Sequence, residues 1–167
     1  MIFILVSDIM ASRKLYFGLQ SAYMDLLEVK LKIFEITSSS LQPRLLQKMA
    51  YICKQGALVN DQILDTFAEK ITKNILKEED EVKQVLNAWF CKARFQNKFF
   101  APNRDEQMKY TREAIKHYQM VICYCARNPE ARKLIPNEYK TSVEVADLLK
   151  RQVKLQEKEK KFEEEDQ

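Results

Sequence analysis

The chain has 167 residues, a formal net charge of +4, 31% charged and 46% hydrophobic side chains, and only 2 glycines and 4 prolines. A chain of this length suits one domain that buries roughly two-thirds of the surface of its unfolded form. The basic residues are spread along the chain and form no sharp stripe, which argues against a nucleic-acid partner. The scarcity of turn formers and the lack of strand-like alternation exclude a β fold and predict an all-α one.

The first expected helix covers residues 2–36, where apolar side chains recur at helical spacing. It ends at Thr37, because the hydroxyl side chains that follow compete for backbone hydrogen bonds. The apolar face consists of Leu5, Ile9, Tyr16, Leu19, Tyr23, Leu26, Leu27, Leu31 and Phe34. A helix that starts at residue 2 without a cap is typical of a chain cut from something longer, or of a divergent or mispredicted start. The open apolar end of this helix indicates an interaction site or a missing neighbour, and self-association through it is one possible outcome.

The second expected helix runs from Pro43, which fits a first helical turn, to Lys73. We expect it to be weakened at Gly56 and near Asn60-Asp61, where the apolar period breaks. Its predicted buried positions are Leu45, Leu46, Met49, Ile52, Cys53, Leu58, Ile63, Leu64, Phe67 and Ile71. A third helix opens in the stretch Lys77–Glu81, because acidic side chains suit a helix N-terminus.

The stretch from Leu86 to Ala131 predicts two antiparallel helices joined by a loop at Pro102. One apolar stripe comprises Val82, Val85, Leu86, Trp89, Phe90 and Ala93, and the other comprises Thr111, Ala114, Ile115, Tyr118, Val121, Ile122 and Cys125. Asn103 with Glu106 three residues later predicts a capping box at the start of the second of these helices. The Asn128-Pro129 pair predicts its end. We expect Trp89 and Tyr118 to be largely buried within this hairpin.

A fifth helix is expected from Pro136, and its apolar stripe ends at Val153. The sequence therefore predicts a helical domain over residues 1–153 and a charged helical extension or disordered tail over residues 154–167. A closed up-and-down bundle and a solenoid of helical hairpins both fit about five helices joined by short loops. The length of the helices and the open apolar end at residue 2 favour the solenoid.

No catalytic or metal-binding motif is present in the sequence. His117 is the one histidine, no Cys-x-x-Cys pair exists, and two glycines, Gly18 and Gly56, cannot supply a Gly-rich phosphate loop. We therefore predict a protein that is not an enzyme and uses no cofactor or metal. His117 is expected to be an exposed or hydrogen-bonded helix residue rather than a catalytic group.

The cysteines and the clustered aromatic residues are expected to be structural. All four cysteines lie within apolar helical pattern and are predicted to be small buried hydrophobes in a reducing compartment; they are Cys53, Cys91, Cys123 and Cys125. The aromatic residues that could line a binding box are Trp89, Phe90, Phe95, Phe99 and Phe100. We assign Trp89 and Phe90 to the core and leave the Phe99-Phe100 pair open. No run reaches the roughly 18 apolar residues of a membrane span, and we expect a cytoplasmic protein.

Several fragments of the chain resemble the C-terminal part of the KIF-binding protein family, and they occur in the same order and at the same spacing as in that family. Members of the family are kinesin-binding adaptors with a tetratricopeptide-like helical solenoid. In the central hairpin these fragments are Ala93-Arg94 with Lys98, His117-Tyr118, Tyr124-Cys125 and Asn128-Pro129-Glu130-Ala131. Upstream, Ala22-Tyr23-Met24-Asp25-Leu26 with Lys30 is similar to the family's Ala-Tyr-x-Asp-Met…Lys helix. Downstream, residues 142–149 resemble its last helix. The similarity is weak between Leu31 and Lys77.

The resemblance implies a tetratricopeptide-like solenoid fragment equivalent to the C-terminal helices of a several-fold longer protein. It also implies a non-enzymatic adaptor that binds kinesin motor domains and limits their engagement with microtubules, located in the cytoplasm and associated with the cytoskeleton. The alternatives are a general helical scaffold for protein–protein interaction and a non-functional C-terminal fragment of the family protein. No partner-binding residue can be assigned from the matched motifs, which look like packing motifs. The first places to test are the expected loop tips at Thr37–Pro43 and Phe99–Arg104.

Overall fold

The computed structural model describes residues 2–166, and it describes side-chain surroundings from Lys14 onward. Within this part the chain forms helices joined by short connections and contains no strand. The α-helices are α1 (Ile2–Ile36), α2 (Gln42–Thr66), α3 (Ala68–Thr72), α4 (Glu79–Lys98), α5 (Arg104–Arg127) and α6 (Pro136–Glu165). A 3-10 helix, η1 (Pro129–Lys133), links α5 to α6. The predicted all-α class is confirmed.

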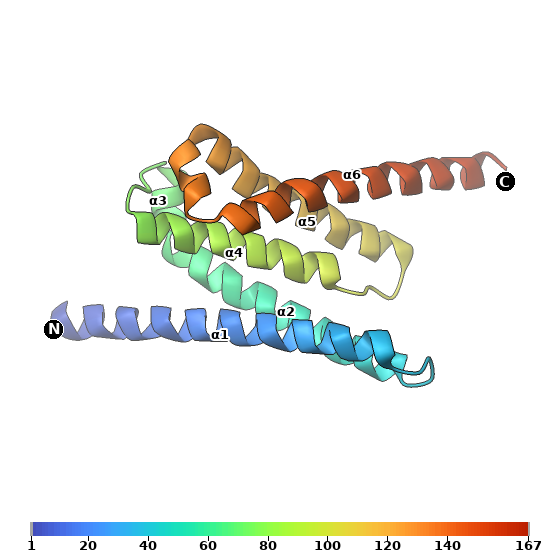
Figure 1. The fold of residues 1–167 in the computed structure, drawn as a ribbon, viewed down its shortest axis with the longest axis horizontal. Helices are drawn as coiled ribbons and strands as arrows, with labels where there is room; N and C mark the ends of the chain where they lie inside the picture. Colours follow the sequence, from blue (N-terminus) through green and yellow to red (C-terminus); the bar gives the residue numbers. More distant parts are fainter. Residues whose placement is uncertain (1, 167) are drawn as a thin grey trace.

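The long helices are stacked in the order of the chain. α1 packs on α2, α2 on α4, α4 on α5 and α5 on α6, so that α1 lies along one edge of the stack and α6 along the other (Figure 1). The two hairpins α1–α2 and α4–α5 turn at the same end of the molecule, whereas α3 and η1 lie at the opposite end (Figure 1). The stack is open at both edges and does not close into a bundle. The prediction of a solenoid-like array is therefore confirmed.

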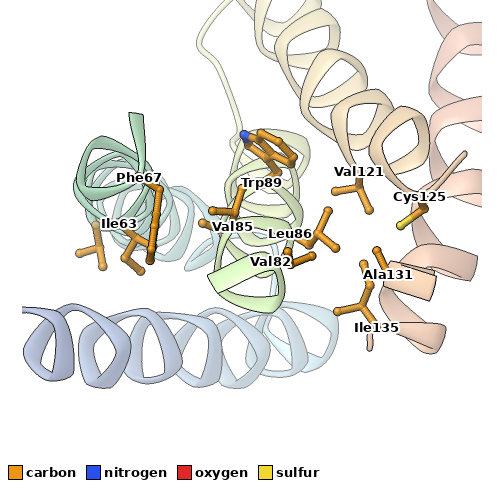
Figure 2. Close-up of a cluster of buried hydrophobic side chains, with 12 residues drawn as sticks. Ile63, Phe67, Val82, Val85, Leu86, Trp89, Val121, Cys125, Ala131 and Ile135 are labelled. Atoms are coloured by element: carbon orange, nitrogen blue, oxygen red, sulfur yellow. The ribbon is translucent and has the colours of Figure 1, made fainter. Parts of the chain in front are cut away.

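The main core lies where α4 is enclosed by its neighbours. Figure 2 shows Val85, Leu86 and Trp89 of α4 between the end of α2 and the segment from α5 to the start of α6. The buried members of this cluster are Val59, Ile63, Phe67, Val82, Val85, Leu86, Ala88, Trp89, Val121, Cys125, Ala131 and Ile135. The two apolar stripes of the predicted hairpin thus face each other, and α4 also packs against α2. The predicted positions Leu5 and Ile9 lie outside the described side chains.

The second helix ends earlier than predicted, and its break lies elsewhere. α2 stops at Thr66, and Phe67 leaves helical geometry with φ −110° and ψ 6° before the short α3 begins. Phe67 is 1% exposed, so the kink places its ring in the main core. The predicted weak points at Gly56 and near Asn60 are continuous helix. Asn60 is fully buried, but its amide donates to the Gly56 carbonyl at 2.8 Å and accepts from Gln20 Nε2 at 2.6 Å, so its polar atoms are satisfied.

Helix α5 begins and ends where the sequence predicts. The Oδ1 atom of Asn103 accepts a hydrogen bond from the Glu106 backbone N–H at 2.9 Å, as the first half of a capping box requires. α5 ends at Arg127, one residue before Asn128-Pro129, and Pro129 starts the 3-10 helix η1. Both ends of the fourth predicted helix are therefore confirmed.

The last helix continues past Val153 to Glu165. Its final turns form ion pairs with the first turns of α5, joining Arg104 to Glu159 at 3.0 Å and Arg112 to Glu157 at 2.6 Å. The extension is thus helical in the described part. The division into a domain at residues 1–153 and a tail at residues 154–167 stays a prediction.

Deleting the residues after Glu157 is expected to lower the free energy of unfolding by less than about 1 kcal/mol. The deletion keeps the Arg112–Glu157 pair and removes only solvent-exposed pairs, such as that between Lys160 and Asp105 at 3.3 Å. Urea unfolding of the full chain and the truncated chain, followed by circular dichroism, measures the difference. A loss above about 2 kcal/mol would show that the tail is part of the folded domain.

Candidate functional site

The central hairpin is built around buried aromatic side chains. Trp89 is 6% exposed and Tyr118 is fully buried, as predicted. The Trp89 ring lies 6.2 Å from that of Tyr124, and the Phe90 ring meets Tyr118 edge-on at 6.0 Å between centroids. These rings link α4 to α5. The core assignment of Trp89 and Phe90 is therefore confirmed.

His117 is buried and held by two neighbours in α4 and α5. Its Nδ1–H donates to the Glu113 carbonyl oxygen at 2.8 Å, and Nδ1 also lies 2.8 Å from Oε1 of Gln96. Burial, aided by the nearby charge of Lys92, lowers the pKa of His117 below its usual value. The side chain is a neutral hydrogen-bonded group that fastens the two helices to each other. Of the two expectations for His117, the hydrogen-bonded one is confirmed and the exposed one is wrong.

The prediction that all four cysteines are buried is wrong for Cys123. Cys53 and Cys125 are buried, Cys91 is half-buried and Cys123 is exposed. Burial raises the pKa of the Cys53 and Cys91 thiols to about 12. Cys123 lies two residues from Cys125 on α5, and this spacing turns it to the other side of the helix.

Alkylation of the native protein is therefore expected to modify Cys123 rapidly and to leave the other three cysteines largely unmodified. The reactive species is the thiolate, which is scarce at the buried thiols because of their raised pKa values. Mass spectrometry after a short pulse of iodoacetamide counts the adducts, and the Cys123→Ser variant is the matched control. Rapid addition of four adducts to native protein would contradict the burial of these thiols.

The described residues hold no cluster suited to metal binding, since no group of three or more His, Cys, Asp and Glu side chains comes together. Within the same part of the chain, no helix has the length and hydropathy of a membrane span.

An apolar cleft of about 270 Å³ opens between α2 and the α4–α5 turn. It is lined by Cys53, Lys54, Ala57, Leu58, Phe95, Gln96, Phe99 and Tyr110. Phe99 is buried against Tyr110 at 4.0 Å between ring centroids, and Lys54 Nζ lies 5.4 Å from the centroid of the Phe99 ring. Phe100 is 60% exposed. The Phe99-Phe100 pair, which the sequence left unassigned, thus consists of a core residue, Phe99, and a residue that is available to a partner, Phe100.

A larger groove of about 720 Å³, here called the α3–α5 groove, lies at the opposite end of the molecule. Its apolar side chains are Ile71, Leu76, Trp89, Met120 and Tyr124, and its cationic side chains are Lys70, Lys116 and Arg127. Among the described residues that line it, none is acidic. Lys70 forms an ion pair with Glu81, whereas no ion pair is recorded in the described part of the chain for Lys116 or Arg127. An apolar floor with a cationic rim suits a protein segment that carries both apolar and acidic side chains.

Sequence reasoning did not find the α3–α5 groove. One of its walls includes α3, which the sequence predicts as a continuation of the second helix and which instead follows the turn at Phe67. Cys123 also lines it, and the cysteine was assigned to the core. No local pattern signals a groove whose walls come from segments separated in sequence.

A comparison with models of protein families matches residues 9–155 to the family described as KIF-1 binding protein C terminal. The chain belongs to this family. The region matched by the KIF-1 binding protein family extends from the first half of α1 to just beyond Val153 in α6, so it includes all or part of every helix of the stack. It includes the segment between Leu31 and Lys77, in which the sequence alone showed little resemblance.

Curated relatives of this family are similar to the chain at low identity. A KIF-binding protein of Danio rerio is 27% identical over 146 residues, which are 82% of this chain and 22% of the relative. The KIF-binding proteins of Gallus gallus and Homo sapiens are 23% and 22% identical, and each alignment covers 84% of this chain but 24% and 23% of the relative. The chain therefore spans less than a quarter of the length of these relatives. No solved structure matches it.

Proposed function

We propose that this chain is a non-catalytic protein that binds kinesin motor domains and limits their engagement with microtubules. The observation that carries the proposal is the match of residues 9–155 to the C-terminal region of a family whose curated members are named KIF-binding protein. An open stack of helices with surface grooves suits such a role, because protein binding requires surface and no reactive group. The protein acts in the cytoplasm, on motors of the cytoskeleton. Self-association through α1 is a separate proposal.

The α3–α5 groove is the surface best suited to hold a segment of the partner. Its apolar floor offers burial, and its exposed Lys116 and Arg127 attract acidic side chains. The loops at residues 37–41 and 99–103 lie at the other end of the stack and provide a second surface with the exposed Phe100 (Figure 1). A motor domain held on these surfaces is kept from the microtubule by steric exclusion.

A pull-down of purified kinesin motor domains by the tagged chain, with microtubule co-sedimentation in parallel, tests the proposal. Binding that moves motor domains from the microtubule pellet to the supernatant is the expected result. A folded chain that binds no motor domain would overturn it, and would favour a general scaffold or a fragment that lacks the function. Motor binding without release from microtubules would retain the adaptor role and overturn the inhibitory one.

A pair of charge-reversal variants tests the groove itself. Lys116→Glu with Arg127→Glu is expected to weaken motor binding by about tenfold or more, because it replaces the cationic rim with an acidic one. The matched control is Lys150→Glu with Lys154→Glu on the exposed side of α6, which makes the same change in net charge. Equal affinities of the two double variants would exclude the α3–α5 groove as the contact surface.

A further inference from the structure

Along α1, apolar side chains that face away from α2 form a continuous exposed stripe. This stripe, here called the α1 seam, consists of Leu15, Ala22, Leu26, Val29, Ile33 and Ile36. Val29 is 53% exposed and Ile36 is 85% exposed, whereas Leu27 on the inner face is fully buried. α1 lies at the edge of the stack, so nothing in the described part of the chain covers this side (Figure 1). The seam is a large apolar surface on a helix that already has its intramolecular partner.

The spacing of the α1 seam is that of a coiled coil. From Ala22 onward its members are separated by four and three residues in alternation, and Leu15 lies one heptad before Ala22. Leu19, which is half-buried, fills the remaining core position of the repeat. Residues 15–36 span about 32 Å of helix, at about 1.5 Å per residue. A seam of this period and length is suited to pairing with another helix along its whole length.

The charges beside the seam are complementary to a second copy of the same helix. Asp25 and Lys32 occupy one edge of the seam in equivalent heptad positions, and Lys30 occupies the other edge. In an antiparallel pair, Asp25 faces Lys32 of the second copy, and in a parallel pair it faces Lys30 of the second copy. No ion pair is recorded for any of these three residues within the described part of the chain. Each orientation therefore places opposite charges together twice, by symmetry.

We propose that two copies of this chain associate through their α1 seams to form a symmetric dimer. The heptad spacing provides the apolar core of the interface, and two symmetry-related ion pairs between Asp25 and a lysine of the other copy lie beside it. The surface is isologous, so that one patch on each copy completes the interface and leaves no open end for further growth. The α3–α5 groove is lined by other helices and stays accessible, and the dimer is independent of the kinesin-binding proposal.

Sedimentation-velocity measurements from low to high micromolar concentration test the dimer. The full chain is expected to shift from monomer to dimer, and Val29→Glu is expected to remain monomeric because it places a carboxylate in the seam. The control is Leu155→Glu, since Leu155 is 60% exposed on α6, outside the seam. Circular dichroism verifies that both variants are folded. A full chain that stays monomeric throughout, or a dimer that Val29→Glu leaves intact, would overturn the proposal.

Charge exchange reports the orientation and provides a second test. Asp25→Lys is expected to raise the dissociation constant of the dimer by about fivefold or more in either orientation. The change places a lysine opposite a lysine of the other copy at both symmetry-related positions. Adding Lys32→Glu restores the dimer if the helices are antiparallel, and adding Lys30→Glu restores it if they are parallel. Failure of both second changes to restore association would show that the seam does not pair as proposed.

Discussion

Replacement of Trp89 by alanine is expected to lower the free energy of unfolding by about 3–5 kcal/mol. The indole is 6% exposed and belongs to the largest buried cluster, in which α4 is enclosed by α2 and α5 (Figure 2). Its removal leaves a cavity that the surrounding helices fill only in part, and it also removes the ring contact with Tyr124.

Equilibrium urea unfolding of the wild type and Trp89→Ala, followed by circular dichroism, measures this loss. Phe100→Ala is the matched control, because it also truncates an aromatic side chain near α4, but one that is 60% exposed. We expect the control to change stability by about 0.5 kcal/mol or less. A loss below about 1 kcal/mol for Trp89→Ala would refute its place in the core.

The helices and their pairing could be predicted because their signals are local. The apolar stripes through Trp89 and Tyr118 have the period of a helix, and each needs only a neighbour to bury it. The hydrogen bond from the Glu106 N–H to Asn103 spans three residues, so the start of α5 could also be read from the sequence.

The break at Phe67 and the exposure of Cys123 could not be predicted in the same way. Phe67 ends α2 because its ring is buried among residues of other helices, and neither glycine nor proline lies close to it in the sequence. Asn60 indicated a weak point in the second helix. In the structure the helix is continuous there, because Gln20 of α1 donates a hydrogen bond to the Asn60 side chain. Each of these features depends on which helices pack against each other. The apolar pattern of a single helix does not carry this information.

For the candidate site, the sequence predicted the protein family but not the residues that are open to a partner. Ordered fragments such as His117-Tyr118 and Asn128-Pro129 pointed to kinesin-binding proteins, yet in the structure His117 and Tyr118 are buried and hold helices together. The surfaces open to a partner are formed by other side chains, among them Lys116 and Arg127 of the α3–α5 groove. Residues that fix a fold are retained in recognisable patterns, whereas binding surfaces of the same fold need not contain them.

Replacement of Gly56 by alanine is expected to destabilise the protein by about 1–3 kcal/mol, although alanine favours a helix more than glycine does. A Cβ atom at Gly56 would overlap the Cζ, Cε1 and Cε2 atoms of Phe95, whose ring is fully buried between α2 and α4. A buried ring cannot withdraw without displacing its neighbours. The absence of a side chain at Gly56 is thus what allows α4 to approach α2 closely.

The second glycine of the chain supplies the matched control. A Cβ atom at Gly18 in α1 meets no atom within 4 Å, so Gly18→Ala is expected to stabilise the protein by about 0.5–1 kcal/mol through helix propensity alone. Urea unfolding of both variants separates the packing effect from the propensity effect. The double variant Gly56→Ala with Phe95→Leu should lose less free energy of unfolding than the sum of the losses of the two single variants, because the smaller leucine side chain makes room for the methyl group. If Gly56→Ala instead stabilised the protein as much as Gly18→Ala, α2 and α4 could not be in the close contact that the stack requires.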